Sequence, residues 1–409
     1  MNENKAVPNI RFKSFENYWV KIKVSNLGNK FTGGGTPSKK NKSYWSGSIP
    51  WFQSSDLILN NVLKISIKKR ITCKAIDESS TKLVSKDSIA IVTRVGVGKL
   101  VLIPYKYTTS QDFISISEII YNKKFVLYLL YYVLNYSRRL GTKQGTSIKG
   151  ITKNYFLTTE VVLPKNSFEQ QKIGDFFTKL DKLLDLQQQK IDKLELLKKA
   201  LLQKLFPKHD AKIPELRFKG FEDNWIIYSF SGLLIKNSSK NKNLEVENIE
   251  SISNKNGFTK QSEQFDGYRV ASLDLSNYYV IKGNQFAYNP SRINVGSIAY
   301  KRKGEEDSII SPLYVSFSTK NNINDAFLWY WFRTSSFKKQ RIQFSEGGVR
   351  DTLPFENLKK MRIKLPRLNE QQKIGSLLSK VDQLIELENK KLQNSQQAKK
   401  CLLQNMFVE

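Results

Sequence analysis

Hydrophobic residues recur at alternating intervals of four and three in two long segments of the chain. In the first segment they are Ile173, Phe177, Leu180, Leu184, Ile191, Leu194, Leu201 and Leu205. In the second they are Ile374, Leu378, Val381, Ile385, Leu392, Leu402 and Met406. A sustained period of 3.5 residues is typical of helices that pack side by side. We therefore predict two helices, each roughly 57 Å long. They are expected to pair through the residues of the first set from Ile173 to Leu194 and those of the second set from Ile374 to Leu392.

Polar residues interrupt both apolar stripes near the middle, at Gln187 and Glu388. Two such stripes in one chain most simply pack on each other, and antiparallel packing would bring these two residues together. A buried polar pair could then fix the register of the helices, whereas the alternative is that both side chains point to solvent. The predicted helices also begin with sequences typical of capping boxes, Ser167 with Gln170 and Asn369 with Gln372.

The two helices belong to a duplication that covers the chain. The segment VPNIRFKSFENYW at 7–19 returns as IPELRFKGFEDNW at 213–225, and EQQKIG at 169–174 returns at 370–375. Between them, RVGVG from Arg94 and RINVG from Arg292 occur in the same order. From Glu169 to Phe206, 17 of 38 positions are identical to those 201 residues further along. The chain therefore contains one module twice, each followed by a helix.

Each module has the pattern of mixed α/β structure. Short β-rich runs such as SIAIVTRV and NQFAYNP lie between Gly, Asn and Ser turns. Apolar blocks from Phe125 and Phe327 predict one core helix per module, and a platform for stacking bases is the less favoured alternative because each block is continuous. The predicted fold class is α+β, with two mixed α/β domains separated by two long helices that pack as an antiparallel coiled coil, in a pseudo-twofold internal repeat. The predicted boundaries are 1–164 and 207–366 for the domains, and 165–206 and 367–409 for the helices.

Charge adds the first indication of function. Sixty-seven Lys and Arg against 37 Asp and Glu give a net charge of +30, which favours a polyanionic partner such as double-stranded DNA. A lysine-rich proteome encoded by an AT-rich genome is the alternative explanation. Two cysteines provide no disulfide framework, which favours a reducing compartment. The N-terminal segment lacks an apolar signal core and no apolar run is long enough to cross a membrane, so we expect a cytoplasmic protein without membrane contact.

The residue patterns of common enzymes are missing. The single histidine, His209, lies in the linker between the modules, where we expect an inert surface residue rather than a metal ligand or a base. Gly98-Lys99 lacks the upstream glycine of a phosphate-binding loop. Asn289-Pro290 is not followed by the residues that would clamp a flipped adenine. We therefore predict no catalytic residue and no metal site on this chain.

One block of residues resembles a known family. The matching residues are GGGTPS at 33–38, Tyr44-Trp45, Ile49-Pro50-Trp51 and Asp56-Leu57. Together with the two EQQKIG helices, they resemble the specificity (S) subunit of type I restriction-modification systems, in which this block begins a common class of target-recognition domain. The second module lacks the block and therefore resembles a different subclass of recognition domain. That departure prevents the transfer of base contacts between the halves and suggests two unlike half-sites.

The resemblance implies a function for each part of the chain. Each recognition domain would bind one half of an asymmetric bipartite DNA target, and the helices would set the gap and dock two methyltransferase (M) subunits and the restriction (R) motor subunits. The chain itself would be non-catalytic and hold no cofactor. Adenine methylation with S-adenosylmethionine, and cleavage driven by ATP with Mg, would belong to the partners. The alternatives are a stand-alone bivalent DNA-binding protein and an autonomous DNA-modifying enzyme.

Candidate DNA-binding residues are cationic, amide or aromatic side chains near glycine-containing turns, where a backbone can approach a duplex closely. In the first half they are Lys39, Lys40, Lys42, Tyr44, Arg94, Lys99, Lys143, Gln144 and Lys149. In the second half they are Arg269, Asn289, Arg292, Asn294, Arg302 and Arg350. For each one, a solvated surface charge or a structural role in a turn is the competing interpretation. Because Arg94 and Arg292 recur in modules that should recognise different bases, their recurrence favours phosphate contact or structure.

Overall fold

The computed structural model describes residues 6–137, 150–208, 211–254, 257–260, 274–347 and 351–409. The chain forms two compact units, one made of residues 1–190 with 388–409 and the other of residues 191–387. Each unit therefore contains one domain together with a segment of each long helix, α4 (Ser167–Lys204) and α9 (Leu368–Met406).

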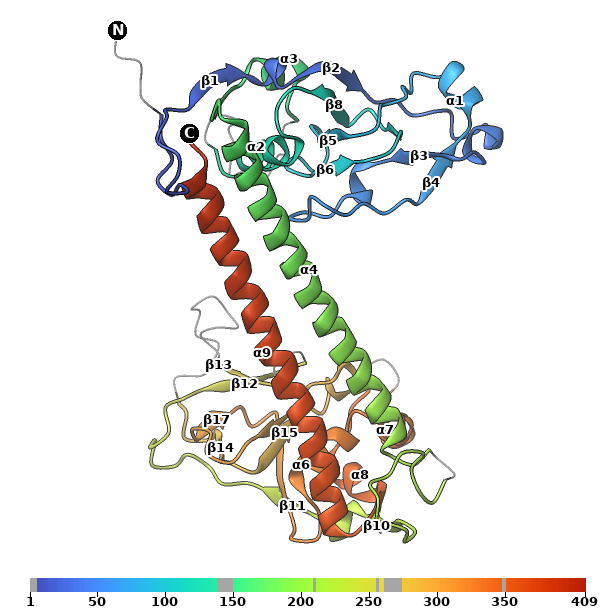
Figure 1. The fold of residues 1–409 in the computed structure, drawn as a ribbon. Helices are drawn as coiled ribbons and strands as arrows, with labels where there is room; N and C mark the ends of the chain where they lie inside the picture. The colour runs from blue at the N-terminus through green and yellow to red at the C-terminus, as the bar shows by residue number, and fades with distance from the viewer. Residues whose placement is uncertain (1–5, 138–149, 209–210, 255–256, 261–273, 348–350) are drawn as a thin grey trace. The chain divides into compact units, whose positions relative to one another are not determined.

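The first unit is built around an antiparallel four-stranded sheet in the order β2-β8-β5-β6 (Figure 1). Its strands are β2 (Gly28–Gly33), β8 (Phe113–Ile119), β5 (Ser88–Val92) and β6 (Leu100–Ile103). Because side chains alternate along a strand, Ile89 and Ile91 of β5 enter the core that contains α2 (Lys123–Asn135). Ala90 and Val92 enter a second core on the opposite face. The central strand is buried on both faces, which explains its uninterrupted apolar sequence.

Smaller elements surround this sheet. A second sheet has the order β4-β3-β7, in which β3 pairs antiparallel with β4 and parallel with β7. The remaining elements are β1 (Val20–Lys23) paired with β9 (Glu160–Leu163), β3 (Ile49–Phe52), β4 (Lys69–Ile71), β7 (Thr108–Thr109), α1 (Cys73–Asp77), α3 (Lys153–Thr158) and the 3-10 turns η1 (Val24–Asn26), η2 (Lys42–Trp45) and η3 (Ser54–Asp56).

The second unit repeats the topology of the main sheet, in the order β11-β18-β15-β16. Its strands are β11 (Leu234–Asn237), β18 (Val315–Thr319), β15 (Gln285–Tyr288) and β16 (Ile298–Lys301). Phe286 and Tyr288 enter the core that contains α6 (Asp325–Trp331), and Ala287 enters the core on the other face. The same division of one strand between two cores therefore occurs in both domains.

The two domains differ outside the shared sheet. The second has two separate ribbons, β12 with β13 and β14 with β17, where the first has the β4-β3-β7 sheet. Its remaining elements are β10 (Ile226–Ser229) paired with β19 (Arg362–Leu365), β12 (Glu250–Ser253), β13 (Gly257–Lys260), β14 (Tyr279–Ile281), β17 (Ser308–Ile310), α7 (Ser335–Phe344), α8 (Phe355–Lys360) and the 3-10 turns η5 (Phe230–Gly232) and η6 (Ile293–Val295). The predicted class of two mixed helix-and-strand domains with long helices is confirmed.

The predicted core helices are α2 and α6. All ten residues from Phe125 to Leu134 of α2 are buried, as are Phe327 and Trp331 of α6. Trp329 of α6 is half-buried and stacks on the guanidinium of Arg333, 3.3 Å from its ring centroid. The buried side chains of both blocks belong to the domain cores, so the interpretation of both blocks as core is confirmed.

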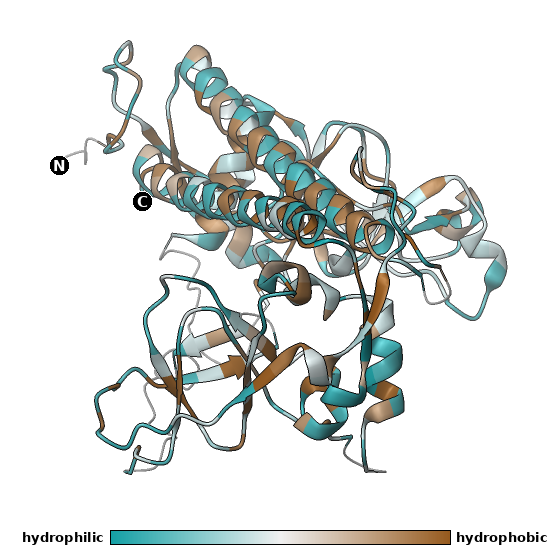
Figure 2. Ribbon diagram, turned by 90° about the horizontal axis from the view of Figure 1, so that it is seen from below, coloured by the Kyte–Doolittle hydropathy of each residue, from teal (hydrophilic) through white to brown (hydrophobic). Residues whose placement is uncertain are grey.

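Within the first unit, α4 and α9 pack antiparallel. Lys399 of α9 forms an ion pair with Asp181 of α4, and further along α4 the Nε2 of Gln187 donates to the backbone oxygen of Glu388, at 3.1 Å. Residue numbers rise along one helix as they fall along the other. Apolar and polar positions alternate along both helices in the pattern expected for paired stripes (Figure 2).

The predicted meeting of Gln187 and Glu388 is confirmed. Glu388 is buried, its carboxylate also accepts from Gln187, and Lys190 and Lys391 lie 2.8 and 3.2 Å from it. Hydrogen bonds from Lys190 and then Gln187 lower the pKa of Glu388 to about 2. The polar interruption of the stripe is therefore a satisfied contact between the helices rather than a pair of solvated side chains.

The ion pair between the helices also occurs in the second unit. Lys198 of α4 lies 2.5 Å from Asp382 of α9, and both residues stand 201 positions from the members of the Lys399–Asp181 pair. Each aspartate accepts a further hydrogen bond from the domain helix at 2.8 Å, from Tyr128 in α2 or from its counterpart Tyr330 in α6. The repeat thus preserves a contact that joins three helices.

The predicted helix-pairing residues occupy two environments. Ile173 and Phe177 share a core with α2 and with Met406 of α9, and Ile374 and Leu378 share one with α6 and with Leu205 and Phe206, which directly follow α4. Ile191, Val381 and Leu392 are buried, and Leu180, Leu184, Leu194 and Ile385 are half-buried. The ends of the stripes therefore pack on the domains as well as on the other helix.

A buried ion pair attaches each domain to its long helix. The Nε and Nη2 of Arg11 donate to the two carboxylate oxygens of Glu169 at 2.7 and 2.9 Å, and Arg217 donates to Glu370 at 2.8 and 2.9 Å. The glutamate side chains are only 1% and 0% exposed. The Arg-Phe pair at 11–12 and 217–218 supplies the arginine of this contact, and EQQKIG supplies the glutamate. This contact explains why the two motifs recur together.

Two further residues of EQQKIG complete the attachment. Gln170 accepts from the backbone N–H of Asn122, the residue that caps α2, and donates to the oxygen of Pro164. Gln371 makes the same pair of contacts in the second unit, with Asn324 and Pro366. The motif's glycines allow α2 and α6 to approach, because a Cβ at Gly174 would lie 2.7 Å from the backbone nitrogen of Phe125 and one at Gly375 would lie 2.9 Å from that of Phe327.

The predicted capping boxes are wrong. The side chain of Asn166, one residue before α4, accepts from the N–H groups of Phe168 and Glu169, and Gln170 is used to hold α2 instead. The second helix begins at Leu368, one residue before the predicted cap Asn369. A contact between elements has taken Gln170, which a local rule assigned to the helix end, and in the second unit the corresponding contact belongs to Gln371 rather than to the predicted Gln372. Within the part of the chain described, no helix has the length and apolar character needed to cross a membrane.

Replacing Glu370 by alanine should destabilise the protein strongly, because the guanidinium of Arg217 would remain buried without its partner. We expect a loss of about 3–5 kcal/mol, measured from the denaturant dependence of unfolding. Asp223→Ala is the matched control in the same unit, since its ion pair with Arg367 is more than half exposed on both sides and should contribute only about 0–1 kcal/mol. Equal effects of the two substitutions would contradict this account of the attachment.

A fragment of residues 1–206 should self-associate. It lacks Met406 and Phe407, which fill the first core, but it retains Leu205 and Phe206, which stand 201 positions before them. A second copy can therefore supply the missing apolar contacts. Light scattering should give twice the fragment mass, and Leu205→Asp with Phe206→Asp should abolish the association. A folded, strictly monomeric fragment would argue against the paired-helix arrangement.

Candidate DNA-binding surface

The family-like block of the first domain builds a stiff loop that carries lysines. The indole of Trp51 donates to the oxygen of Gly35 at 3.0 Å, the indole of Trp45 donates to Ser38, and the two rings meet edge to face at 5.0 Å. Gly34 and Gly35 are required by close packing, because a Cβ at either would lie within 2.5 Å of backbone atoms. The predicted residues Lys39, Lys40 and Lys42 are exposed on this loop.

Two other candidates of the first domain make contacts within the protein. The Tyr44 hydroxyl donates to Glu78 at 2.7 Å, and its ring packs against the small core of Trp51 and Ile71. Lys99 is half-buried and donates to the backbone oxygen of Ser54 at 3.2 Å. Both contacts give these side chains a role in holding loops together.

The turn between β5 and β6 presents Arg94 at the surface. Arg94 and Val95 are exposed, Val95 by 68%. Gly98, the last residue of the repeated RVGVG motif, has a φ of +97°, a conformation that glycine adopts without strain. This turn lines an open hollow of about 610 Å³, together with Gln111 before β8 and Lys153 at the start of α3.

The second domain has a corresponding hollow of about 710 Å³ at the turn between β15 and β16. The predicted residues Asn289, Arg292 and Asn294 line it, with Val295 and Leu313. Gly296, the counterpart of Gly98, has a φ of +91°. The side-chain oxygen of Asn289 accepts from the N–H of Ser291 at 3.0 Å, which stabilises the turn.

The remaining candidates lie elsewhere. Arg302 is exposed but follows β16, at the opposite end of the strand from Arg292, so the two are separated by about 13 Å of extended chain. Lys143, Gln144, Lys149, Arg269 and Arg350 lie outside the described residues, as does His209. The hollows therefore unite only some of the predicted side chains.

Several residues of the hollows were not predicted, among them Gln111 and Leu313. Neither stands beside a glycine turn or in a repeated motif, and their sequence neighbourhoods differ. They reach the hollows because β8 and β18 pair with β5 and β15. Only the pairing of strands distant in sequence could have indicated them.

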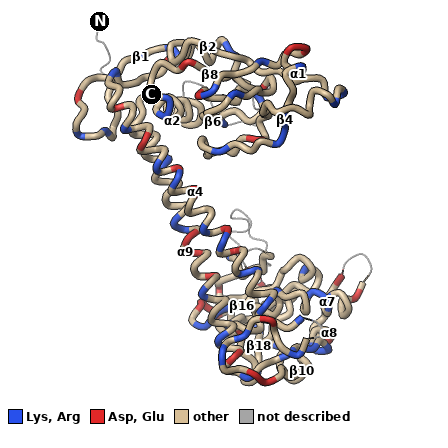
Figure 3. Tube along the Cα trace, turned by 45° about the vertical axis from the view of Figure 1, so that its right-hand side comes forward, with Lys and Arg blue, Asp and Glu red and all other residues tan. Residues whose placement is uncertain are grey.

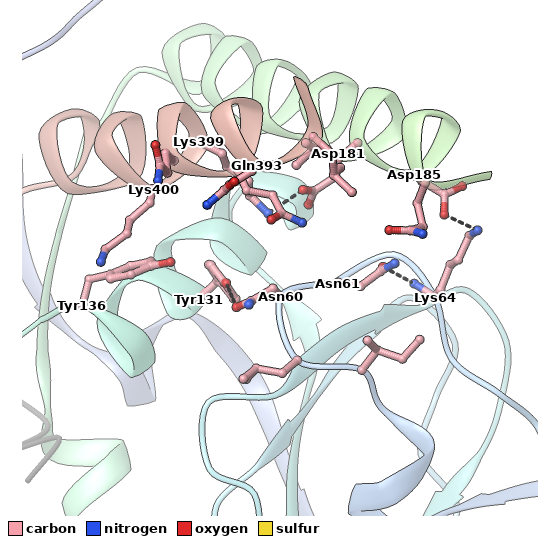
Figure 4. A pocket seen from close by; sticks show the side chains of 17 residues that line it. Asn60, Asn61, Lys64, Tyr131, Tyr136, Asp181, Asp185, Gln393, Lys399 and Lys400 are labelled. Carbon is pink, nitrogen blue, oxygen red and sulfur yellow. Dashed lines mark hydrogen bonds and ion pairs between the residues drawn. The ribbon is translucent and has the colours of Figure 1, made fainter. Parts of the chain in front are cut away.

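A further cavity of about 560 Å³ lies in the first unit between α2, α4 and α9. Figure 4 shows Lys399 directed at Asp181, with Tyr131 and Asn60 on the facing side. The Tyr131 hydroxyl donates to Asn60 at 2.6 Å, and Lys64 pairs with Asp185. Both aspartates of this cavity are thus paired with lysines, which is consistent with a structural role for this part of the fold.

Basic side chains are widely distributed over the described part of the chain. Lys and Arg are spread over both domains and along both long helices (Figure 3). Across the described ranges there is no group of three or more His, Cys, Asp or Glu side chains that could hold a metal ion. The exposed groups of the two hollows are guanidinium, amide and aliphatic, the types that contact phosphates and base edges.

Comparison with known proteins gives a consistent result. The family profile for the type I restriction modification DNA specificity domain matches residues 16–196 and 230–395. The type I restriction enzyme MjaIX specificity subunit of Methanocaldococcus jannaschii is 26% identical over 322 residues, which cover 75% of this chain and 71% of that protein. The EcoR124I/EcoR124II specificity subunit of Escherichia coli is 33% identical over 184 residues, or 42% of this chain and 43% of that protein.

Solved structures support the fold. The crystal structure of a type I restriction-modification system S subunit from M. genitalium aligns over 98% of this chain and 99% of its own, with a TM-score of 0.62 and 16% identity. A chain from a structure of complex assembly and conformational transition in a type I R-M system aligns over 95% and 96%, with a TM-score of 0.55. The two stretches matched by the family profile correspond to the two repeats, and this chain therefore belongs to the type I restriction-modification DNA specificity family, with two DNA specificity domains.

Proposed function

We propose that this chain is the non-catalytic specificity subunit of a type I restriction-modification complex and that each domain binds one half of an asymmetric, bipartite DNA target. The observation that carries the proposal is the combination of a common sheet with unlike surroundings. Both domains place a turn with an exposed arginine beside a hollow, yet the peripheral sheets and the other hollow residues differ. Two modules of this kind suit two different half-sites.

The helices are proposed to set the gap between the half-sites. A reader of two separated sites discriminates by spacing only if its modules are held rigidly, because distance and helical phase must both match the duplex. The Arg11–Glu169 and Arg217–Glu370 pairs and the Asp181–Lys399 and Asp382–Lys198 pairs supply that rigidity within each unit.

Partner subunits are proposed to dock on the helices. Leu183 and Leu186 of α4 are 62% and 60% exposed, and their counterparts Leu384 and Leu387 of α9 are 46% and 48% exposed. Large apolar side chains that recur on the outside of both helices suit two copies of one partner, such as two methyltransferase subunits. S-adenosylmethionine, ATP and Mg would serve those and the restriction subunits, in the cytoplasm, where chromosomal and invading DNA meet.

Methylome sequencing of the host should test this function directly. With the gene intact we expect methylated adenines in one split motif with a fixed gap, and deletion of the gene should remove that motif alone. The full-length protein should also co-purify with a methyltransferase encoded nearby. A methylome unchanged by deletion, together with DNA binding by the unaccompanied chain, would favour a stand-alone bivalent DNA-binding protein instead.

Arg94→Ala and Arg292→Ala should weaken DNA binding about equally for all sequences, because an arginine common to both domains is suited to phosphates. Each substitution should reduce the slope of log affinity against log salt by about 0.9, measured by fluorescence anisotropy. Lys106→Ala is the control, since this exposed lysine follows β6 at the end remote from the Arg94 turn. A change in base preference without a change in slope would refute phosphate contact at these residues.

A further inference from the structure

The two hollows have two pieces of each domain in common. One piece is the turn of the central hairpin, β5 to β6 or β15 to β16, and the other is the segment that enters the next strand of the sheet, β8 or β18; the first hollow also includes the end of β2 and the start of α3. The strands pair in the same way, since Ile91 faces Ile114 and Tyr288 faces Val315, and these side chains belong to or pack against the core of the domain helix. Corresponding segments can therefore be assigned without sequence similarity.

Gln111 and Leu313 lie in corresponding segments, at positions one residue apart. Gln111 stands three residues before Ile114, and Leu313 stands two residues before Val315. Each lines its hollow together with the exposed arginine and an exposed valine of the hairpin turn. The hollows thus share an arginine and a valine and differ in the side chain that this segment supplies, an amide in one domain and an aliphatic side chain in the other.

The amide of Gln111 is oriented by a neighbour. The hydroxyl of Thr36 donates to its Oε1 at 2.6 Å, while the side chain remains exposed. This contact comes from the GGGTPS loop and restricts the rotation of the Gln111 side chain before DNA binds. Less conformational entropy is therefore lost on binding. An oriented amide presents a donor and an acceptor side by side, which matches the N7 and N6 groups of adenine in the major groove.

Leu313 is held outward by its turn. Pro312 restricts the backbone before it, and the N–H of Tyr314 donates to the backbone oxygen of Ser311 at 3.0 Å. The Leu313 side chain is 80% exposed. Val295, 53% exposed, lies in the same hollow. A single exposed leucine needs no explanation, but this one lies beside Arg292 and Asn294. Aliphatic side chains among such groups can pack on the methyl group of thymine.

We propose that Gln111 and Leu313 are specificity-determining residues, the first contacting an adenine in one half-site and the second a thymine methyl group in the other. This inference rests on the proposed function, because it names bases that each domain would contact. The arginines common to the two hollows contact the backbone and contribute affinity, and the segment that differs contributes sequence preference. The unlike half-sites then follow from different side chains on a common framework.

Reciprocal substitution of the full-length chain tests the proposal. Gln111→Leu and Leu313→Gln would each be used to select bound duplexes from a pool randomised across both half-sites, with the unsubstituted protein in parallel. We expect Gln111→Leu to reduce the preference for adenine at one position of one half-site by roughly 5- to 150-fold, the effect of losing one good base contact. Leu313→Gln should change one position of the other half-site, from thymine to adenine.

Thr36→Val is a second variant, which frees the amide of Gln111 without removing it. It should weaken the preference at the same position as Gln111→Leu, and by a smaller factor. Both altered side chains of the reciprocal pair are exposed, so melting temperatures should not change. Unaltered preferences in a protein that is otherwise specific, or an equal loss for all sequences, would overturn this assignment alone. A parent protein without any split preference would overturn the proposed function as well.

Discussion

The buried ion pair between an arginine near the start of each repeat and the glutamate of EQQKIG is the contact on which both units depend. Arg11 with Glu169 and Arg217 with Glu370 carry opposite charges into places where the glutamate has almost no access to water. Either residue alone would be costly to bury, so the pair ties the beginning of each domain to the long helix that follows it. The glutamine and glycine of the same motif then fix the core helix against the long one. A domain attached through three neighbouring positions of one helix cannot rotate freely about it.

Recurrence and difference consequently have separate meanings in this chain. The residues that recur 201 positions apart are mostly those that hold the domains to the helices and the helices to each other, as the Lys399–Asp181 and Lys198–Asp382 pairs illustrate. The elements in which the domains differ pack on the face of the shared sheet opposite the domain helix, as the β4-β3-β7 sheet in one and the ribbons in the other. A duplicated protein that recognises two unlike sequences needs this division, because changes on that face leave the attachment intact.

The sequence was sufficient for features with a period or a repeat. It predicted the long helices, the core helices at Phe125 and Phe327 and the meeting of Gln187 with Glu388, because packing of regular elements leaves a regular trace. It failed where the decisive contact joins segments distant in the chain. Gln170, assigned to a capping box, binds the domain helix instead, and the second long helix begins one residue before its predicted cap. Gln111 and Leu313 were missed because only the pairing of β8 with β5 and of β18 with β15 brings them to the hollows.

The same reasoning separates affinity from specificity at the DNA surface. A side chain common to both domains, such as the arginine of the hairpin turn, cannot distinguish half-sites that differ. It is therefore suited to contact a feature that all duplexes share. The phosphate backbone is that feature, and its contribution falls with salt. Side chains that differ between corresponding segments have the opposite property, since the framework around them is common. In a duplicated reader the search for base contacts should therefore begin in segments that strand pairing makes equivalent and whose side chains differ in chemistry.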